Sequence, residues 1–300
     1  MPHSKSILEI EQISLQTINR LIQKAFRYKK KKTTHKFKNK IIGNLFFEPS
    51  TRTCGSFESA IYRGGGNAIN FHAINSSIKK GESLDDTVKT MEQYCDVLII
   101  RDSEKGSMQK YSQITTKPII NAGDGNGEHP TQALLDLFTI VHHFHIPGPI
   151  TITFCGDLKN SRTCHSLIKL LDRINPQTIF YFVSCDELRL SDEFLMSIKN
   201  MAIICNDLAS VIQKTDVLYM TRLQKERMSD TESYAPITLT KELLDGAPTN
   251  MILMHPLPRN EEIPVECDAN PRSKYFEQME NGVYMRMAIL NDCFKKGWIG

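Results

Sequence analysis

A strand leads into a helix at Phe46-Phe47-Glu48-Pro49-Ser50-Thr51-Arg52-Thr53. The apolar run 41–47 is short and bulky, as in a buried parallel strand. After the turn, apolar residues recur at helical spacing from Phe57 until glycines 64–66 end the pattern. Backbone N–H groups at a helix start have no partner within the helix, and the helix dipole favours an anion there. Two hydroxyls and a guanidinium add donors, so the turn predicts a phosphate site, although a capping serine and an exposed arginine would explain it as well.

Length and composition describe an ordinary globular protein. The 300 residues suggest about two domains, and 40% of them are hydrophobic and 24% charged. No apolar run approaches the roughly 18 residues of a membrane span, and the N-terminus lacks a signal-peptide core. The eight cysteines form no C-x-x-C pair, which is typical of a reduced protein without a disulfide framework or zinc site. We therefore expect a cytoplasmic protein with no membrane partner.

A basic run at 27–32, followed by Lys36, Lys38 and Lys40, is the one concentration of charge in the sequence. Such runs can form nucleic-acid or membrane patches. Here only Tyr28 and Phe37 are interleaved, so no aromatic platform for bases is present. With a net charge of only +3, a solvated helix end and loop is the favoured interpretation, and no nucleic-acid partner is expected.

Strands and helices alternate along the chain from residue 41 onward. The expected strands are 41–47, 68–71, 97–100, 118–120, 150–154, 179–183, 202–205, 217–220 and 251–254. The expected helices are 7–26, the segment following Ser50, 83–94 with Ser83 and Asp86 as a capping pair, 130–145, 163–173 and 283–296. This alternation predicts an α/β fold with two doubly wound parallel-sheet domains. The break at Pro147-Gly148-Pro149 divides them into 1–146 plus the C-terminal helix 283–300, and 147–282.

Cationic side chains gather where the expected strands end. They are Arg52, Arg101, Arg162 and Arg222, with Lys80 on a polar loop. In doubly wound sheets, ligands bind beyond the carboxyl ends of the strands. One arginine at a strand end is usually only exposed, but four at successive ends predict substrates that carry several negative charges, such as a phosphate and carboxylates.

A dinucleotide site is a second interpretation of the glycine-rich loop 123–127. Its glycines follow a strand and precede a helix, as in a nicotinamide fingerprint. The spacing is wrong, because Glu128 stands where the third glycine of G-x-G-x-x-G is needed. The sequence therefore disfavours a dehydrogenase.

A metal site is a further alternative at His142, His143 and His145. No carboxylate or cysteine has a clear ligand spacing to them, and they lie where a helix is expected to end. A solvated helix end is favoured, and no metal is expected.

Several motifs together resemble those of one family, the aspartate/ornithine carbamoyltransferases. The matching stretches, in family order, are 47–53, 76–82, 123–125, 129–132, 134–137, 219–227 and 255–259. The loop at 76–82 and the last two stretches resemble the aspartate branch, since an ornithine enzyme is expected to have a cysteine after His255. The resemblance implies transfer of the carbamoyl group of carbamoyl phosphate to the amine of L-aspartate, the committed step of pyrimidine biosynthesis.

The resemblance also implies roles for individual residues. Ser50, Thr51, Arg52 and Thr53 are expected to hold the phosphate. Thr53, Arg101 and His129 are expected to polarise the carbamoyl oxygen, and Gln132 with the backbone carbonyls of Leu257 and Pro258 to bind the carbamoyl nitrogen. Arg162, Arg222, Gln224 and Lys80 are expected to bind aspartate. The departing phosphate is the expected base, with His129 as its rival, and no metal or organic cofactor is implied.

Two further expectations concern assembly and motion. In the family the loop carrying Ser76 and Lys80 enters the active site of a neighbouring chain, which implies a homotrimer with sites between domains and between subunits. Glu48 is expected to pair with Arg162 and Arg227 when substrates close the domains. Regulatory chains or a dihydroorotase partner are left open by the sequence.

One departure from the family pattern lies beside the phosphate turn. Cys54-Gly55 stands where the family usually has a second arginine and a bulky apolar residue. Because Arg52 is retained, altered packing is expected rather than lost chemistry. Alternatives are an ornithine or related carbamoyltransferase and a catalytically silent homologue that acts as a binding subunit.

Overall fold

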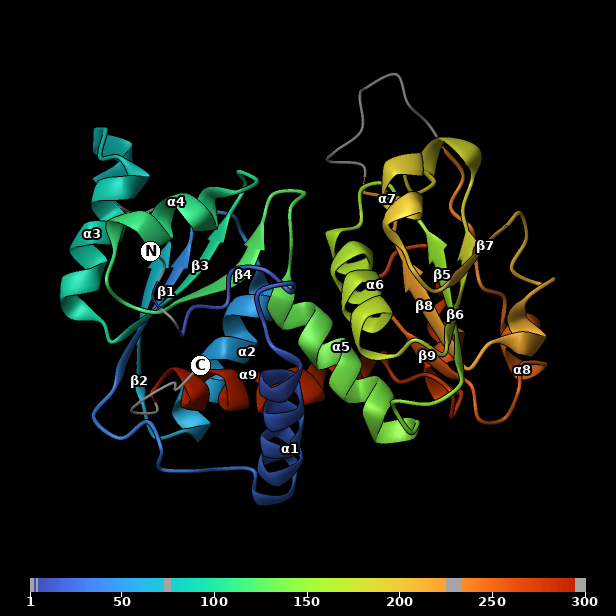
Figure 1. Cartoon of the computed structure of the whole chain (residues 1–300), viewed down its shortest axis with the longest axis horizontal. Helices are drawn as coiled ribbons and strands as arrows, with labels where there is room; N and C mark the ends of the chain where they lie inside the picture. Colours follow the sequence, from blue (N-terminus) through green and yellow to red (C-terminus); the bar gives the residue numbers. More distant parts are fainter. Residues whose placement is uncertain (1–2, 4, 73–76, 225–233, 295–300) are drawn as a thin grey trace. The chain divides into compact units, whose positions relative to one another are not determined.

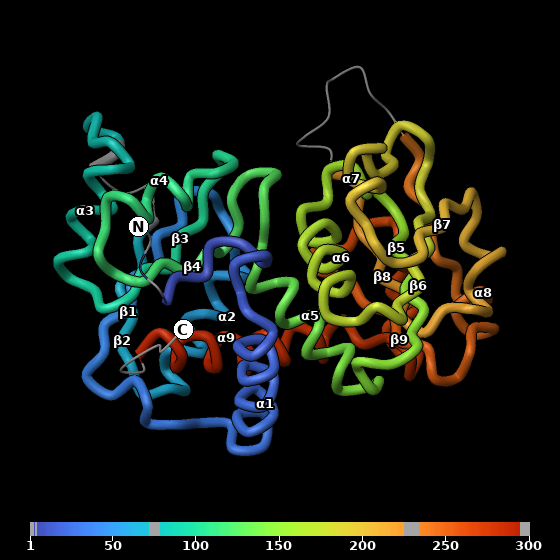
Figure 2. The backbone as a smooth tube through the Cα atoms, viewed as in Figure 1, coloured from blue at the N-terminus to red at the C-terminus, as the bar shows by residue number. Residues whose placement is uncertain are grey.

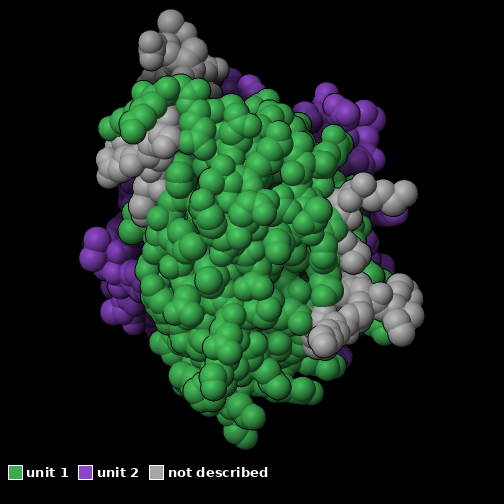
Figure 3. All heavy atoms as spheres, turned by 90° about the vertical axis from the view of Figure 1, so that its left-hand side faces the viewer, with its two compact units in different colours: residues 1–138, 280–300 green, residues 139–279 purple. Residues whose placement is uncertain are grey.

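The structure is a computed structural model that describes residues 3, 5–72, 77–224 and 234–294. The chain divides into two compact units, Met1–Phe138 with Glu280–Gly300, and Thr139–Met279 (Figure 3). The domain limits expected from the sequence stay a prediction. No helix among the described residues has the length and apolar character needed to cross a membrane.

The first unit is built on a four-stranded parallel sheet (Figure 1). Its strands are β1 (Ile41–Phe46), β2 (Asn67–His72), β3 (Val97–Asp102) and β4 (Ile119–Asp124), in the order β2-β1-β3-β4. Its helices include α2 (Thr51–Arg63), α3 (Leu84–Tyr94) and α4 (Ser107–Ile114), with the short 3-10 turn η2 (Ser77–Lys80). Figure 1 shows α3 and α4 on one side of this sheet and α2 on the other. Side chains of β1 and β3 pack with those of α3 and α4 to form a buried apolar core.

The second unit is built on a five-stranded parallel sheet. Its strands are β5 (Ile150–Gly156), β6 (Thr178–Val183), β7 (Met201–Cys205), β8 (Val217–Thr221) and β9 (Ile252–Met254), in the order β7-β6-β5-β8-β9. Its helices include α6 (Arg162–Ile174), α7 (Asp192–Ser197) and α8 (Lys241–Asp245), with the 3-10 turns η3 (Asp186–Leu188), η4 (Ile212–Lys214) and η6 (Val265–Ala269). Phe154, Phe180, Phe182 and Tyr219 place their rings together on one face of the sheet. The predicted fold class, α/β with two parallel sheets, is confirmed.

The strand order creates one switch point in each sheet. The chain leaves β1 towards β2 on one side, whereas it leaves β3 towards β4 on the other. In the same way it leaves β5 towards β6 and β8 towards β9. In doubly wound sheets such points favour ligand binding beyond the carboxyl ends of the strands, here those of β1 and β3 and those of β5 and β8. The predicted arginines lie at these strand ends: Arg52 follows β1, Arg101 is the second-last residue of β3, and Arg162 and Arg222 follow β5 and β8.

The N-terminal helix is shorter at its start than predicted. Helix α1 (Leu15–Lys31) begins at Ser14, whose side chain accepts a hydrogen bond from the Thr17 amide at 3.2 Å. Ile7 instead pairs with β4, with its amide 2.8 Å from the Ile119 carbonyl. The expected helix over 7–26 was therefore wrong before residue 15, and Leu15 is exposed rather than on the buried face. The lysine run forms the last turn of α1, as predicted for a helix end.

Several other helices also differ from expectation. Helix α9 (Tyr275–Cys293) begins eight residues before the predicted start at 283. Its first turns bury Tyr275 and Gln278, a polar-aromatic mixture that periodicity does not reveal. Helices α4, α7 and α8 were not predicted, because they are only eight, six and five residues long. Helix α4 also follows Gly106, which has φ of 82°. The backbone trace of Figure 2 follows α1, α5 (Pro130–His143) and α9 as long, unbroken helices.

Candidate functional site

The first turn of α2 presents backbone donors without competing acidic side chains. Ser50 is the N-cap residue, with extended φ and ψ of −160° and 93°, and its hydroxyl makes no capping hydrogen bond. The first bond within the helix runs from the Cys54 amide to the Ser50 carbonyl at 3.1 Å, so the amides before it point beyond the helix end. Thr51 and Arg52 are exposed and Thr53 is buried. The turn has the features of an anion site rather than those of a serine-capped helix.

The departure at Cys54-Gly55 leaves this turn open on its outer side. A Cβ placed on Gly55 would meet no atom within 4 Å. Burial raises the pKa of the half-buried Cys54 thiol above its ordinary value, and nearby Glu58 adds to the effect. Cys54 is therefore protonated at neutral pH and is no anion binder itself.

Arg101 stands on β3 directly beside the end of β1. Its Cα pairs in register with Phe46, the last residue of β1. Its Nη2 lies 2.9 Å from Glu48 Oε2, and its Nη1 donates to the Ala122 carbonyl at 3.4 Å. Glu48 therefore pairs with Arg101 inside the first unit in this structure. The guanidinium is partly buried at the switch point, where it can bind an anion strongly.

The glycine-rich loop between β4 and α5 is organised by Asp124. Its Oδ1 accepts from the Glu128 amide at 2.8 Å and its Oδ2 from the Gly106 amide at 2.8 Å. Gly125 has φ of 51°, and a Cβ there would lie 2.3 Å from the Ser103 carbonyl oxygen. The glycine thus serves close packing against the loop after β3, which accounts for the motif without a dinucleotide. The loop ends at His129, immediately before α5.

His129 and Gln132 are both buried at the start of α5. Thr131 Oγ1 lies 3.4 Å from His129 Nδ1. Gln132 Nε2 donates to Asp136 Oδ1 at 2.9 Å, so its amide nitrogen is engaged by this carboxylate. Asp136 lies in the matched stretch 134–137 but was not predicted as a site residue, although its i,i+4 spacing from Gln132 places the two on one helix face.

A buried guanidinium lies behind these residues. Arg286 of α9 packs over the Phe57 ring of α2, with 4.9 Å from its Cζ to the ring centroid. Burial lowers the pKa of Arg286 to about 10, and the charge of Asp136 opposes this shift. The side chain therefore stays charged at neutral pH and supports the helices that carry the phosphate turn and Gln132.

The remaining predicted residue of the first unit, Lys80, ends the η2 turn and is exposed. Ser76 and Arg227 lie outside the described residues.

In the second unit, Gly156 and Asp157 bring the ends of β5 and β8 together. Gly156 has φ of 119°, and a Cβ there would lie 2.1 Å from the carbonyl oxygen of Thr221, its partner on β8. Asp157 is fully buried and accepts from the Asn160 amide at 3.0 Å and from the Gln224 amide at 3.1 Å. One carboxylate thus holds the segments after both strands.

The arginines predicted to bind carboxylates follow these strands. Arg162 is the first residue of α6, after the N-cap Ser161, and is buried. Arg222 follows β8, is half-buried, and its Nη1 donates to the Leu223 carbonyl at 2.9 Å. Gln224 is half-buried, and its amide is held by Asp157. Topology therefore brings the stretches carrying Arg162, Arg222 and Gln224 to one switch point.

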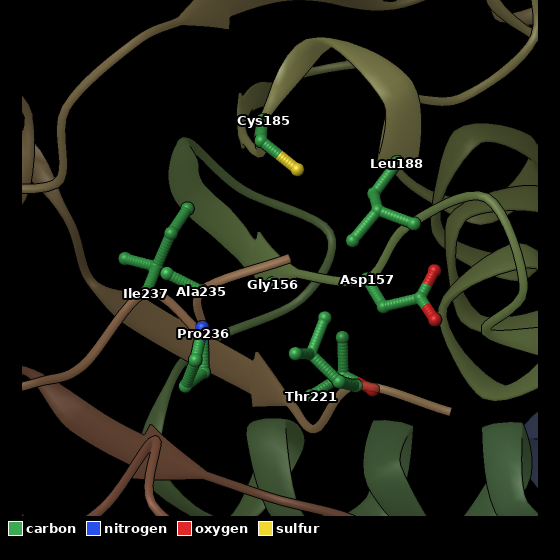
Figure 4. Close-up of a pocket in the computed structure, with 9 residues that line it drawn as sticks. Gly156, Asp157, Cys185, Leu188, Thr221, Ala235, Pro236 and Ile237 are labelled. Carbon is green, nitrogen blue, oxygen red and sulfur yellow. The ribbon is translucent and has the colours of Figure 1, made fainter. Parts of the chain in front are cut away.

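A small pocket lies beside these strand ends (Figure 4). It is lined by Gly156, Asp157, Cys185, Leu188, Thr221, Leu223, Ala235, Pro236 and Ile237. The lining is mainly apolar and contains none of the predicted site residues. Burial raises the pKa of the Cys185 thiol, so this cysteine is not a thiolate nucleophile at neutral pH.

The turn after β9 carries the predicted Leu257 and Pro258. Leu257 is half-buried with φ of 54°, a left-handed conformation uncommon for leucine. Its amide donates to His255 Nδ1 at 2.8 Å. Pro258 is exposed, and Arg259 Nη2 donates to Asp268 Oδ2 at 2.7 Å. The turn is therefore held on both sides of the predicted ligand contacts.

The histidines at the end of α5 have an acidic neighbour that their sequence spacing does not predict. His142 Nε2 and His143 Nε2 lie 3.4 Å and 3.3 Å from the two carboxylate oxygens of Glu277. The described part of the chain contains no group of three or more His, Cys, Asp or Glu side chains arranged to hold a metal ion. The contacts fit a helix end paired with one carboxylate.

Two family models together match nearly the whole chain. The carbamoyl-phosphate binding domain of aspartate/ornithine carbamoyltransferases matches residues 5–142, and the aspartate/ornithine binding domain matches residues 149–293. The chain is similar to the aspartate carbamoyltransferase catalytic subunit of Archaeoglobus fulgidus, with 42% identity over 297 residues, covering 96% of this chain and 98% of that protein. It is 45% identical over 267 residues to the multifunctional protein pyr1-3 of Dictyostelium discoideum, covering 87% of this chain but only 12% of that protein.

Solved structures agree with the sequence matches. Aspartate transcarbamoylase from Trypanosoma cruzi in complex with carbamoyl phosphate and aspartate superposes with a TM-score of 0.91 at 40% identity, covering 97% of each chain. The same enzyme in complex with N-(phosphonacetyl)-L-aspartic acid gives a TM-score of 0.90 at 40% identity, covering 97% of this chain and 95% of that one. This chain therefore belongs to the aspartate/ornithine carbamoyltransferase family.

Proposed function

We propose that the chain catalyses carbamoyl transfer from carbamoyl phosphate to the amine of L-aspartate, giving N-carbamoyl-L-aspartate and phosphate. The observation that carries this proposal is the pair of cationic switch points, one with Arg52 and Arg101 and one with Arg162 and Arg222. A phosphate donor and a dicarboxylate acceptor are the ligands that such a pair suits. Near-full-length similarity to aspartate carbamoyltransferase catalytic subunits supports the assignment. We infer that the reaction belongs to pyrimidine biosynthesis.

Carbamoyl phosphate is assigned to the first unit through its phosphate. Ser50, Thr51, Arg52 and Thr53 bind the phosphate through the helix N-terminus, their hydroxyls and the guanidinium. No acidic residue lies in this first helical turn to repel it. The binding energy comes from groups that are fixed before the ligand arrives, so little reorganisation is needed.

The carbamoyl group is assigned to hydrogen-bond donors at its oxygen and to hydrogen-bond acceptors at its nitrogen. Thr53, Arg101 and His129 donate to the carbamoyl oxygen, where negative charge grows in the tetrahedral intermediate. Gln132 accepts from the carbamoyl nitrogen, which fits an amide whose own nitrogen is engaged by Asp136. The carbonyls of Leu257 and Pro258 are further acceptors for that nitrogen.

Aspartate is assigned to the second unit. Arg162 and Arg222 bind its two carboxylates, with Gln224 and Lys80 assisting, and guanidinium forks suit both carboxylates. The departing phosphate takes the proton of the attacking amine, with His129 as the rival base. All eight cysteines are free thiols, which supports a reducing compartment such as the cytoplasm.

Assembly and closure complete the proposal. We propose a homotrimer in which Ser76 and Lys80 serve the site of a neighbouring chain. Mixing Arg52→Ala chains with Lys80→Ala chains tests this, because activity returns on mixing only when one site draws residues from two chains. Glu48 pairs with Arg101 in this structure, and its exchange to Arg162 and Arg227 when substrates bind remains part of the proposal.

The deciding experiment is product formation by the purified chain with carbamoyl phosphate and either aspartate or ornithine. Carbamoylated product with aspartate alone supports the proposal and its branch. Turnover of ornithine would reassign the acceptor, and no product with either would favour a silent binding subunit. The chain spans only 12% of the multifunctional relatives, so activity of the isolated chain also tells whether it acts without further domains.

A further inference from the structure

The turn 255–258 contains no backbone N–H group that is available to a ligand. Pro256 and Pro258 have none, and the Leu257 amide is engaged by His255 Nδ1 at 2.8 Å. The turn therefore offers carbonyl oxygens only. Such an edge binds an NH2 group and has nothing to offer an acceptor or a methyl group.

His255, whose ring holds the Leu257 amide, is itself buried and in contact at both its backbone and its ring. His255 is fully buried, and its own amide donates to Gln278 Oε1 at 3.0 Å. Its Nε2 lies 2.9 Å from Glu262 Oε1, off the line of an ideal hydrogen bond. Glu262 is also buried, and the same oxygen accepts from the Asn260 amide at 3.0 Å. All of these residues belong to the second unit, so the arrangement is complete within one compact body.

The contacts also determine the protonation of the ring. Because the Leu257 amide donates to Nδ1, that nitrogen carries a lone pair and the single proton lies on Nε2, facing the carboxylate. Burial lowers the pKa of His255, although Glu262 opposes the shift, so the ring is neutral at neutral pH. Burial alone would raise the pKa of Glu262, but contacts from His255 and the Asn260 amide outweigh it and leave this pKa below its ordinary value.

We propose that His255 and Glu262 are positioning residues that aim the Leu257 carbonyl at the NH2 group of carbamoyl phosphate. Leu257 has φ of 54°, a conformation that leucine rarely adopts by itself. The hydrogen bond to His255 holds the peptide before Leu257, and with it the direction of the carbonyl that follows. This inference rests on the proposed function. It adds to the groups proposed to touch the ligand the two residues, His255 and Glu262, that orient one of those groups, the Leu257 carbonyl.

The test compares two ligands that differ only where the Leu257 carbonyl acts. Carbamoyl phosphate carries NH2 where acetyl phosphate carries CH3, and inorganic phosphate carries neither. Dissociation constants of all three are measured by calorimetry on the full chain and on its variants. His255→Leu removes the acceptor for the Leu257 amide at similar volume, whereas His255→Asn keeps an oxygen near the position of Nδ1.

We expect His255→Leu to raise the dissociation constant of carbamoyl phosphate about tenfold. The dissociation constants of acetyl phosphate and phosphate should stay within about twofold of those of the unmodified chain. We expect His255→Asn to restore most of the loss. Thr153→Val is the matched control, because it removes a different buried hydrogen bond of the same unit, between Thr153 and Thr215 at 2.6 Å. Equal weakening of all three ligands, or unchanged affinity for carbamoyl phosphate, would overturn the proposal.

If His255→Leu does not fold, as judged by its melting transition, Glu262→Gln replaces it as the test variant. It keeps the shape of the side chain and removes only the charge beside Nε2, so we expect a loss of about threefold that is again confined to carbamoyl phosphate. Failure of the proposed function has a different signature, since the unmodified chain would then bind no carbamoyl phosphate and form no product, and this inference would fall with it.

Discussion

The two proposed sites are built by different means. In the first unit the residues proposed to bind phosphate, 50–53, are consecutive and lie at the start of one helix, whose backbone provides donors. In the second unit Arg162, Gln224 and Leu257 come from segments far apart in the chain. Buried polar residues hold these segments, Asp157 at the strand ends and His255 at the last turn. A local site depends on one helix start, whereas a dispersed site depends on the buried groups beneath it.

The sharpest test of the local site is Arg52→Ala. The guanidinium is exposed and is the one proposed to bind the phosphate, so we expect turnover to fall by about 10²- to 10⁴-fold with little change in melting temperature. Steady-state rates and a thermal melt measure both. Arg63→Ala, at the other end of the same helix, is the control and should keep its rate within about twofold. An Arg52 variant that keeps its rate would show that the site is misplaced.

Gly156→Ala tests the dispersed site through its backbone. The new Cβ would lie 2.1 Å from the Thr221 carbonyl at φ of 119°, so β5 and β8 must separate. We expect a loss of about 3 kcal/mol or more in the free energy of unfolding, together with weaker aspartate binding. Denaturant unfolding and the KM for aspartate measure this. A variant of unchanged stability would mean that the strand ends tolerate separation.

Asp292→Asn tests a buried charge of the first unit that lies outside the proposed site. Burial would raise the pKa of Asp292, but hydrogen bonds from Arg20 and Lys24 outweigh it and leave this pKa below its ordinary value. A carboxylate whose pKa is lower in the folded than in the unfolded state stabilises the fold at pH values above its unfolded-state pKa. This stabilisation is lost as the pH falls through the folded-state pKa. We therefore expect Asp292→Asn to lower the free energy of unfolding by about 2 kcal/mol at neutral pH. Below about pH 4 the variant should lose less of its stability with falling pH than the unmodified chain does.

Unfolding free energies measured between pH 2 and 7 check this prediction. The carbamoyl-transfer rate at neutral pH should stay near that of the unmodified chain. A parallel pH profile in the variant would show that other carboxylates dominate acid unfolding.

Glu48→Gln tests the ion pair at the edge of the local site. Glu48 pairs with Arg101 here, and the proposed closure requires it to engage arginines of the second unit. We expect the apparent affinity for aspartate to fall about fivefold, and that for carbamoyl phosphate to change less. Equal effects on the two substrates would indicate that Glu48 acts through Arg101 alone.

Gly55→Ala is expected to have the smallest effect and the opposite sign. A Cβ meets no atom within 4 Å there, and alanine favours a helix over glycine, so we expect a gain of about 0.5–1 kcal/mol in unfolding free energy. Chemical denaturation measures it. Gly55→Ala and Gly156→Ala are the same chemical change at two positions. Their opposite expected effects distinguish a position where the backbone requires glycine, Gly156, from one where it does not, Gly55.

Local pattern was sufficient for much of the fold. The strands and their order along the chain followed from apolar runs, and the helix start at Ser83 followed from its capping pair, whose serine accepts from the Asp86 amide at 3.1 Å. The prediction failed at α4, α7 and α8, and at the starts of α1 and α9. There, short length or burial of polar and aromatic residues hides the helical period, because tertiary contacts rather than sequence spacing decide the boundary.

For the candidate site, the sequence alone determined which residue types follow the strands and the family to which the chain belongs. Only the tertiary structure decided which strand ends are neighbours, because strand order depends on crossovers that spacing does not encode. It also placed Asp136 behind Gln132, Asp157 beneath Gln224, and Glu262 behind His255. These carboxylates act through hydrogen bonds and burial, and both of these exist only once distant segments have packed together.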